Sequence, residues 1–196
     1  MPLTPLNPDN ALMFGADDDR LYLGPYGIDL SSITGVTSDI PSGLIDCGWI
    51  SDDGLQDELS DSAEKIYGHQ GKKVVKSFIS ESSTNLTATV LETKLDLLLW
   101  YWDAKAEKAQ ETVNGDQVDI VKITIPSGRK AVDLCGVRDL VETSTGKIMR
   151  TVYPKLTLGE RDAVEYKVGS IAAYKLNLEQ IGDATMFSNV PSLIPA

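Results

Sequence analysis

Short segments in which apolar and polar residues alternate recur along this chain of 196 residues, and a period of two is typical of strands with one buried face. An apolar segment at residues 44–50 precedes a polar stretch, and alternation returns at 72–79 and 85–90. Further segments with a strand pattern cover residues 118–125, 132–137, 148–158 and 163–178, the last with a break at Gly169. The pattern predicts a mainly β protein with antiparallel strands.

A helical period interrupts this series between residues 91 and 102. The leucines on one face of the predicted helix recur at the spacing i, i+4, i+7 and i+8. We therefore expect a helix anchored on a sheet by four side chains: Leu91, Leu95, Leu98 and Leu99.

The two ends of this helix carry separate signals. Residues 89–92 read Thr-Val-Leu-Glu, which fits a capping box with Thr89 as the N-cap residue. Beyond Trp102, residues 104–109 could continue the helix. The Asn-Gly pair at residues 114–115 then either ends it or forms a hairpin turn.

Both ends of the chain are rich in proline, which favours extended or irregular structure. We expect residues 1–31 to form an N-terminal arm, with short strands at 11–14 and 21–23 around an acidic turn. Residues 183–196 are expected to form an apolar C-terminal arm that docks on this or another subunit. Between the arms, residues 32–182 are predicted to fold as one antiparallel β-sandwich or partly closed barrel with one flanking α-helix.

Residues 51–71 form the longest polar stretch between predicted strands, and they contain six acidic residues. We expect an exposed inter-strand loop here. A connection of this length is normally either functional or disordered.

Charge is distributed unevenly along the chain, whose formal net charge is −11. Residues 1–64 contain thirteen acidic residues and one basic residue, Arg20, whereas residues 65–196 contain sixteen acidic and seventeen basic residues. This balance argues against tight nucleic-acid binding, which needs a basic surface. It is compatible with a solvated acidic surface, and also with a head-to-tail contact between the acidic third of one subunit and a more basic surface of the next.

Cys47 and Cys135 both lie inside predicted strands, so we expect buried free thiols and no disulfide. No apolar run approaches the length of about 20 residues that spans a bilayer. The first residues lack the basic start and apolar core of a secretory signal. The sequence therefore predicts synthesis in the cytoplasm.

Motifs that carry catalysis or phosphate binding are incomplete. His69 is the single histidine, so one chain cannot supply a two-histidine zinc motif. The stretch 66–73 resembles a phosphate loop, but Ile66 occupies the first glycine position and Lys73 the Ser/Thr position. No Gly-x-Ser-x-Gly elbow occurs.

The Asp-Asp-Gly sequence at residues 52–54 resembles part of a calcium loop. Alignment on Gly54 places Trp49 and Ser60 at the end ligand positions, where calcium needs oxygen ligands that a tryptophan cannot supply. We predict no catalytic residue, no metal site and no cofactor. A hydrolase built on scattered carboxylates remains an open alternative.

The order of strand, long loop, two strands and helix resembles that of the major tail tube protein of long-tailed, siphovirus-like bacteriophages. The resemblance rests on Gly-Trp-Ile-Ser-Asp-Asp-Gly at residues 48–54, the polar stretch after it, and the direct passage from the strand at 85–90 into the helix. It covers the middle third of the chain.

This resemblance implies a structural virion protein that polymerises as stacked hexameric rings and encloses a conduit for the genome. Its implied partners are further copies of itself and the tape measure, tail-terminator and distal tail or baseplate proteins, while DNA passes without specific binding. By the same resemblance, the long loop reaches the adjacent ring. The side chains expected to make that contact are Asp52, Asp53, Asp57, Glu58, Asp61, Glu64 and His69.

The alternative is a stand-alone β-sandwich binding module or another virion component, such as a decoration or tail-terminator protein. In that case residues 51–71 would be a ligand-binding loop. The assembly state of the purified protein distinguishes the two hypotheses.

Overall fold

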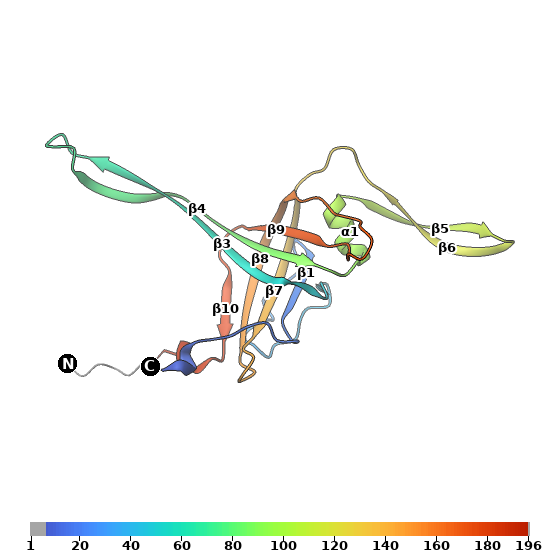
Figure 1. Cartoon of the computed structure of the whole chain (residues 1–196), viewed down its shortest axis with the longest axis horizontal. Coiled ribbons are helices and arrows are strands. Elements are labelled where there is room, and N and C mark those ends of the chain that lie inside the picture. Colours follow the sequence, from blue (N-terminus) through green and yellow to red (C-terminus); the bar gives the residue numbers. More distant parts are fainter. Residues whose placement is uncertain (1–6, 196) are drawn as a thin grey trace. The chain divides into compact units, whose positions relative to one another are not determined.

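The computed structural model describes residues 7–195 and is mainly β, with antiparallel strand pairs (Figure 1). Among the described residues, α1 (Leu95–Trp102) is the one α-helix. The predicted fold class is therefore confirmed, and no sheet in this part of the chain closes into a barrel. The chain forms two compact units, each assembled from separate segments.

The first unit contains residues up to Gly48, Asp133–Leu156, and the residues from Ile181 on. In its sheet, β1 (Arg20–Pro25) lies between β2 (Ile45–Asp46) and β7 (Val132–Val141). Strand β8 (Ile148–Arg161) follows β7, and β10 (Thr185–Ser188) pairs with β8.

Burial in the strands of this unit does not simply alternate: β7 is buried without interruption from Leu134 to Asp139, on both of its faces. The core cluster consists of side chains from β7, β8 and the segment between β1 and β2: Ile33, Leu44, Cys135, Val137 and Val152. Both Cys47 and Cys135 are buried free thiols, as predicted, and burial raises the pKa of the Cys135 thiol.

Parts of both predicted arms are sheet strands. Strand β1 supplies two fully buried leucines, Leu21 and Leu23, and β10 pairs with β8. The strand expected at residues 11–14 is absent, and the 3-10 helix η1 (Pro8–Asn10) precedes this irregular stretch. A second 3-10 turn, η2 (Pro191–Leu193), lies after β10. The predictions for residues 1–6 and 196 lie outside the described residues.

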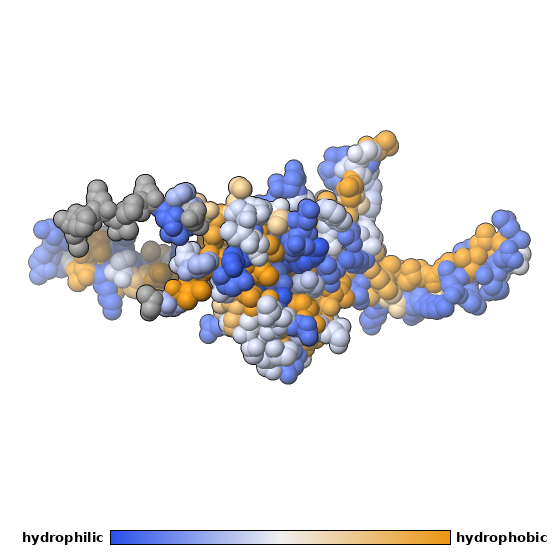
Figure 2. All heavy atoms as spheres, turned by 90° about the horizontal axis from the view of Figure 1, so that it is seen from below, coloured by the Kyte–Doolittle hydropathy of each residue, from blue (hydrophilic) through white to orange (hydrophobic). Residues whose placement is uncertain are grey.

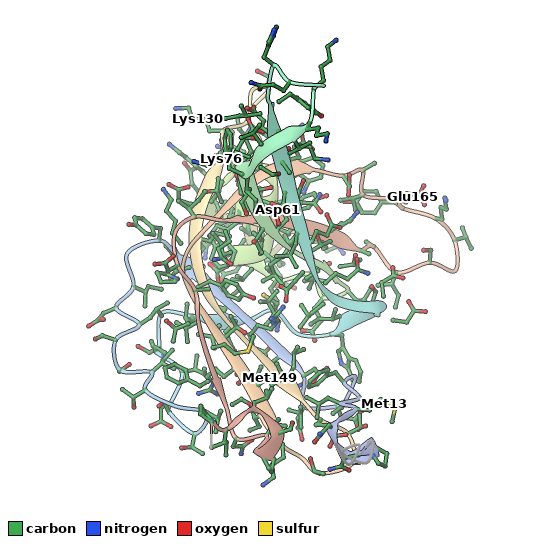
Figure 3. All side chains as sticks on the ribbon, turned by 90° about the vertical axis from the view of Figure 1, so that its left-hand side faces the viewer. Met13, Asp61, Lys76, Lys130, Met149 and Glu165 are labelled. Carbon is green, nitrogen blue, oxygen red and sulfur yellow. The ribbon has the colours of Figure 1, made fainter. Side chains whose placement is uncertain are left out.

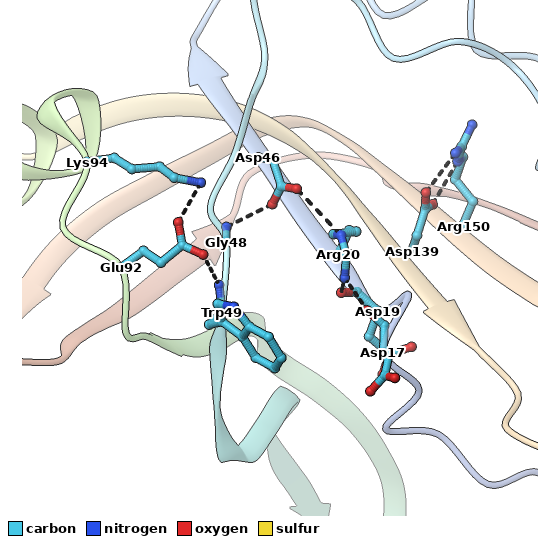
Figure 4. Close-up of polar contacts among 10 residues, drawn as sticks. All are labelled: Asp17, Asp19, Arg20, Asp46, Gly48, Trp49, Glu92, Lys94, Asp139 and Arg150. Carbon is cyan, nitrogen blue, oxygen red and sulfur yellow. Dashed lines mark hydrogen bonds and ion pairs between the residues drawn. The ribbon is translucent and has the colours of Figure 1, made fainter. Parts of the chain in front are cut away.

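A buried ion pair fixes the segment between β1 and β2. The Arg150 guanidinium donates two hydrogen bonds of 2.7 Å to the Asp139 carboxylate (Figure 4). The same side chain donates to the backbone carbonyls of Ser38 and Gly35. Because both charged groups are buried, loss of either partner would leave the other without compensation. The pair thereby holds residues 35–38 against the sheet.

The turn between β7 and β8 is organised by one buried carboxylate, that of Glu142. It accepts hydrogen bonds from the hydroxyl and backbone N–H of Thr145, at 2.6 and 2.7 Å, and from the corresponding groups of Ser144. These bonds, led by the Thr145 hydroxyl, lower the pKa of Glu142 from 4.5 to about 2. Hydrogen bonds to the ionised form have this effect because protonation removes acceptor capacity.

We expect this turn to make stability depend on pH in acid. A lowered folded-state pKa contributes stability above the ordinary value of 4.5, and that contribution is lost as the pH falls towards about 2. In thermal melts, the stability difference between the wild-type protein and Glu142→Gln should shrink over this window, because the glutamine does not titrate. A constant difference from pH 7 to pH 3 would contradict this account.

The second unit contains Trp49–Val132 and Thr157–Gln180. Its strands in the eight-stranded sheet pair β3 (Ile50–Tyr67) with β4 (Val74–Val90), β4 with β9 (Tyr174–Gln180), and β9 with β8. A separate hairpin pairs β5 (Lys105–Val113) with β6 (Asp116–Thr124).

One face of β4 and β9 is the core of this unit. The buried side chains that alternate along the two strands are Leu86, Ala88, Val90, Tyr174, Leu176 and Leu178. Helix α1 contributes Leu97 and Tyr101 to the buried core. The Tyr101 ring meets that of Tyr174 edge to face at 5.4 Å between centroids, and its hydroxyl donates to the Asp162 carbonyl.

The helix is shorter than predicted and uses another face. It begins at Leu95, because Thr89 and Val90 continue β4 and pair with β9. The capping box does not form: the Glu92 carboxylate accepts a hydrogen bond from the Trp49 N–H at 2.9 Å and pairs with Lys94 (Figure 4). Strand pairing thus overrides the local signal.

Of the four predicted anchors, Leu95 is exposed, while Leu91, Leu98 and Leu99 are only half-buried. The extension over 104–109 is also wrong, since these residues begin β5 after a left-handed residue at Asp103. Asn114 and Gly115, both with positive φ, form the turn of the β5–β6 hairpin. Of the two alternatives predicted for this pair, the hairpin turn is therefore correct.

The largest correction concerns residues 51–71. Most of this stretch is strand β3. The predicted segments 72–79, from Val74 on, and 85–90 belong to one continuous strand, β4. The final predicted strand is shorter than expected, since only Tyr174–Gln180 is β9 and residues 162–173 are irregular.

Two leucines two positions apart in α1 provide a matched test of the helix. Leu97 is 2% exposed and Leu95 is 47% exposed. Leu97→Ala should reduce the free energy of unfolding by about 2–5 kcal/mol. Leu95→Ala should change it by about 0.5 kcal/mol or less, as expected for a surface position. Chemical denaturation of both variants checks this, and equal losses would show that the helix buries a different face.

Candidate functional site

The outer part of the β3–β4 hairpin is a two-stranded ribbon. Strand β4 pairs with β9 only from Asn85 to Val90. Over residues 59–84, β3 and β4 therefore pair only with each other, and we call this part of the hairpin the ribbon (Figure 1). The ribbon begins at Leu59 of β3 and ends at Thr84 of β4, which lie opposite each other. An isolated two-stranded ribbon is at best marginally stable in water, and its outer edges present unpaired backbone groups.

The ribbon exposes large apolar side chains. Their exposed fractions run from 42% to 77%. They are Leu59, Ile66, Tyr67, Val74, Val75, Phe78 and Ile79.

These side chains lie on both faces of the ribbon. Residues directly opposite each other share a face, and neighbours along a strand point to opposite faces. Ile79 is opposite Ala63 and Phe78 is opposite Glu64, so the two apolar side chains point to different faces. Burial of apolar surface is worth about 25 cal/mol per Å². A partner that covered either face of the ribbon would therefore bury apolar surface, which contributes favourable free energy to binding.

Charge changes sign along the ribbon. Residues 21–64 contain no lysine or arginine, whereas residues 65–80 contain four lysines and no acidic residue. Figure 3, which looks towards this hairpin from the left of Figure 1, labels Asp61 in the acidic part and Lys76 in the basic part. The ribbon thus has an acidic start and a basic tip, which we define as residues 65–76.

The predicted contact residues are spread along this hairpin. Asp52 and Asp53 lie near the start of β3, beside an irregularity in its pairing, and Asp57 and Glu58 follow where the strand becomes regular. All of the seven residues are exposed.

The remaining three belong to the ribbon. Asp61 accepts a hydrogen bond from the Ser82 hydroxyl at 2.7 Å, Glu64 lies opposite Phe78, and His69 is in the turn. The structure does not gather the seven side chains into one cluster. The sequence analysis did not identify the basic tip. Its signal in the sequence is that residues 65–80 contain four lysines and no acidic residue.

The second hairpin, β5–β6, is also exposed. Ion pairs cross it from Lys108 to Asp119 at 2.7 Å and from Lys122 to Glu107 at 3.6 Å. Apolar side chains lie beside these charged ones along the hairpin (Figure 2). Those exposed on or just after its strands are Val113, Val118, Ile120, Val121 and Ile125.

The sheet of β3, β4 and β9 has one apolar and one polar face. Along β9 the buried residues alternate with Lys175, Asn177 and Glu179, which point to the face opposite the core. Their cross-strand neighbours on that face are Asn85, Thr87 and Thr89 of β4, of which Thr87 is buried. One side of the sheet is therefore core and the other presents polar side chains.

Within residues 7–195, no three His, Cys, Asp or Glu side chains are placed to hold a metal ion together. No helix in the same residues has the length and apolar character to cross a membrane. No family model matches the sequence, and no curated protein matches it.

Two positions of β4 test whether the ribbon contributes to the stability of the single subunit. Leu86→Ala, in the buried part, should cost about 2–5 kcal/mol of unfolding free energy. Ile79→Ala, in the exposed ribbon, should cost at most about 1 kcal/mol, the range of strand propensity alone. Denaturation of monomeric protein measures both. A loss at Ile79 as large as that at Leu86 would show that the ribbon is packed within its own subunit.

Proposed function

We propose that this chain is a structural subunit of a tail tube of the kind found in long-tailed bacteriophages. Copies would polymerise as stacked hexameric rings that form the conduit for genome delivery. The observation that carries the proposal is the ribbon, with apolar side chains exposed on both faces and free strand edges. A subunit that buries these groups only against other copies has a strong drive to assemble.

The two-sided sheet supports the same function. A tube wall needs an apolar side that packs on the body of the subunit and a polar side that faces a hydrated passage. The sheet of β3, β4 and β9 combines these, with α1 on the apolar side and Lys175, Asn177 and Glu179 on the other. We assign the polar face to the lumen.

The acidic net charge fits a passage through which DNA slides. Tight binding of DNA needs a basic surface, and the face assigned to the lumen carries one lysine and one glutamate on β9, so it offers no such surface. In this proposal DNA passes without specific binding, and the subunit has no catalytic role. Its partners are further copies of itself and, by the resemblance, the tape measure, tail-terminator and distal tail or baseplate proteins. The assembled location is the virion tail, after synthesis in the host cytoplasm.

Shortening the ribbon tests the proposal. Asp61 and Ser82 lie directly opposite each other, so residues 62–81 can be replaced by an Asn-Gly turn that joins them. We expect this variant to keep the circular dichroism spectrum and the melting temperature of the monomer, because the deleted residues lie outside the core. It should form no tubes in negative-stain electron microscopy under conditions in which the full-length protein does.

Tubes of normal appearance from the shortened variant would contradict the role given to the ribbon. A full-length protein that stays monomeric at every concentration would favour the alternative, a stand-alone β-sandwich binding module.

A further inference from the structure

A groove with a volume of about 510 Å³ lies within the first unit. One wall comes from the segment after β1, and the other from β8 and β10. Its apolar lining includes Tyr26, Ile28, Leu30, Val152, Pro154 and Phe187.

The groove carries negative charge. Asp29 belongs to its lining, and the Asp29 carboxylate accepts a hydrogen bond from the Ser31 N–H at 2.9 Å. The wall after β1 has no cation, because residues 21–64 contain no lysine or arginine. The nearest basic group on the other wall, Lys155, pairs with Asp133 at 2.8 Å and lies over the Tyr26 ring. Its charge is thus already compensated.

The tip of the ribbon has the complementary character. Its four lysines are Lys65, Lys72, Lys73 and Lys76. Among residues 7–195, none of them lies within ion-pair distance of a carboxylate. Between these cations, Ile66, Tyr67, Val74 and Val75 are exposed. A binding partner for the tip therefore needs an apolar surface with negative charge at its border, and the groove provides both.

We propose that the tip of the ribbon in one subunit docks into the groove of a second copy of this chain. Apolar side chains of the tip fill the groove, and the lysines meet the Asp29 carboxylate. The contact joins two different surfaces of the same chain, so it is heterologous and can repeat from copy to copy without closing on a pair. This inference rests on the proposed function and names the surface that receives the ribbon.

Charge reversal on each side tests the contact. The tip variant carries Lys72→Glu and Lys73→Glu, and the groove variant carries Asp29→Lys. A control with Lys105→Glu and Lys130→Glu makes the same charge change as the tip variant away from the tip. Asp29→Asn keeps the hydrogen-bond acceptor for Ser31 and removes only the charge. Circular dichroism verifies that each variant is folded.

We expect the tip and groove variants each to raise the protein concentration needed for assembly at least tenfold, measured by sedimentation. The control should assemble like the wild-type protein, and Asp29→Asn should lie between the wild type and Asp29→Lys. A chain that combines the tip and groove reversals should recover assembly, because the charges are again opposite.

Mixing the two variants shows whether the contact joins different copies. The tip variant keeps a normal groove, and the groove variant keeps a normal tip. Their mixture should therefore form complexes that contain both chains, detected by native mass spectrometry, yet do not grow into tubes. Each variant alone should form no such complexes.

The outcomes separate the two proposals. Wild-type assembly by both reversed variants would overturn the docking of the tip and leave the tail tube function standing. Absence of tubes from the wild-type protein would overturn the tail tube function. If the wild-type protein forms no tubes, complexes that contain both variants would still establish the docking of the tip in the groove. Absence of such complexes would overturn the docking too.

Discussion

The exposed apolar side chains of a two-stranded ribbon are the constraint on which the rest of this structure depends. Ile79 and Phe78 point to opposite faces, so no single covering layer within the subunit could bury both. The core lies elsewhere, on the face of β4 and β9 that α1 covers. The chain therefore folds around one part of strand β4 and presents the other part to solvent. In the proposed function, the buried part provides stability and the exposed part provides association.

The two compact units have separate means of holding their shape. In the first, Arg150 and Asp139 fix the segment between β1 and β2, which forms one wall of the groove. In the second, the contact between Tyr101 and Tyr174 joins helix to sheet. Since neither device involves the ribbon, changes in the ribbon can affect association while leaving both units folded. This separation is what a subunit needs if it is first made as a monomer and later built into a larger assembly.

Strands with one buried face were predictable from the sequence, because burial of one face produces an alternation such as that of β9, where buried residues alternate with exposed or half-buried ones from Tyr174 to Glu179. The ribbon has no buried face, so β3 lacks that alternation, and the sequence therefore predicts a loop over residues 51–71. The capping box at 89–92 failed because pairing of β4 with β9 outweighed a local signal. The predicted helix face was also wrong: Leu97 is buried and Leu95 is exposed, because residues two positions apart in an α-helix face nearly opposite sides. In the candidate site, the role of the seven expected contact residues stays a prediction, and the groove is lined by segments far apart in the chain, which left no local pattern.

Hydrogen exchange in the ribbon tests the central claim most directly. Amide exchange can be followed by mass spectrometry at protein concentrations below and above those at which assembly occurs, with the buried segment at residues 86–90 as the internal reference. The account predicts rapid exchange in residues 59–84 of the monomer and strong protection of the same amides in the assembly, while the reference remains protected in both. Equal exchange of the ribbon in the two states would contradict the claim that association buries it.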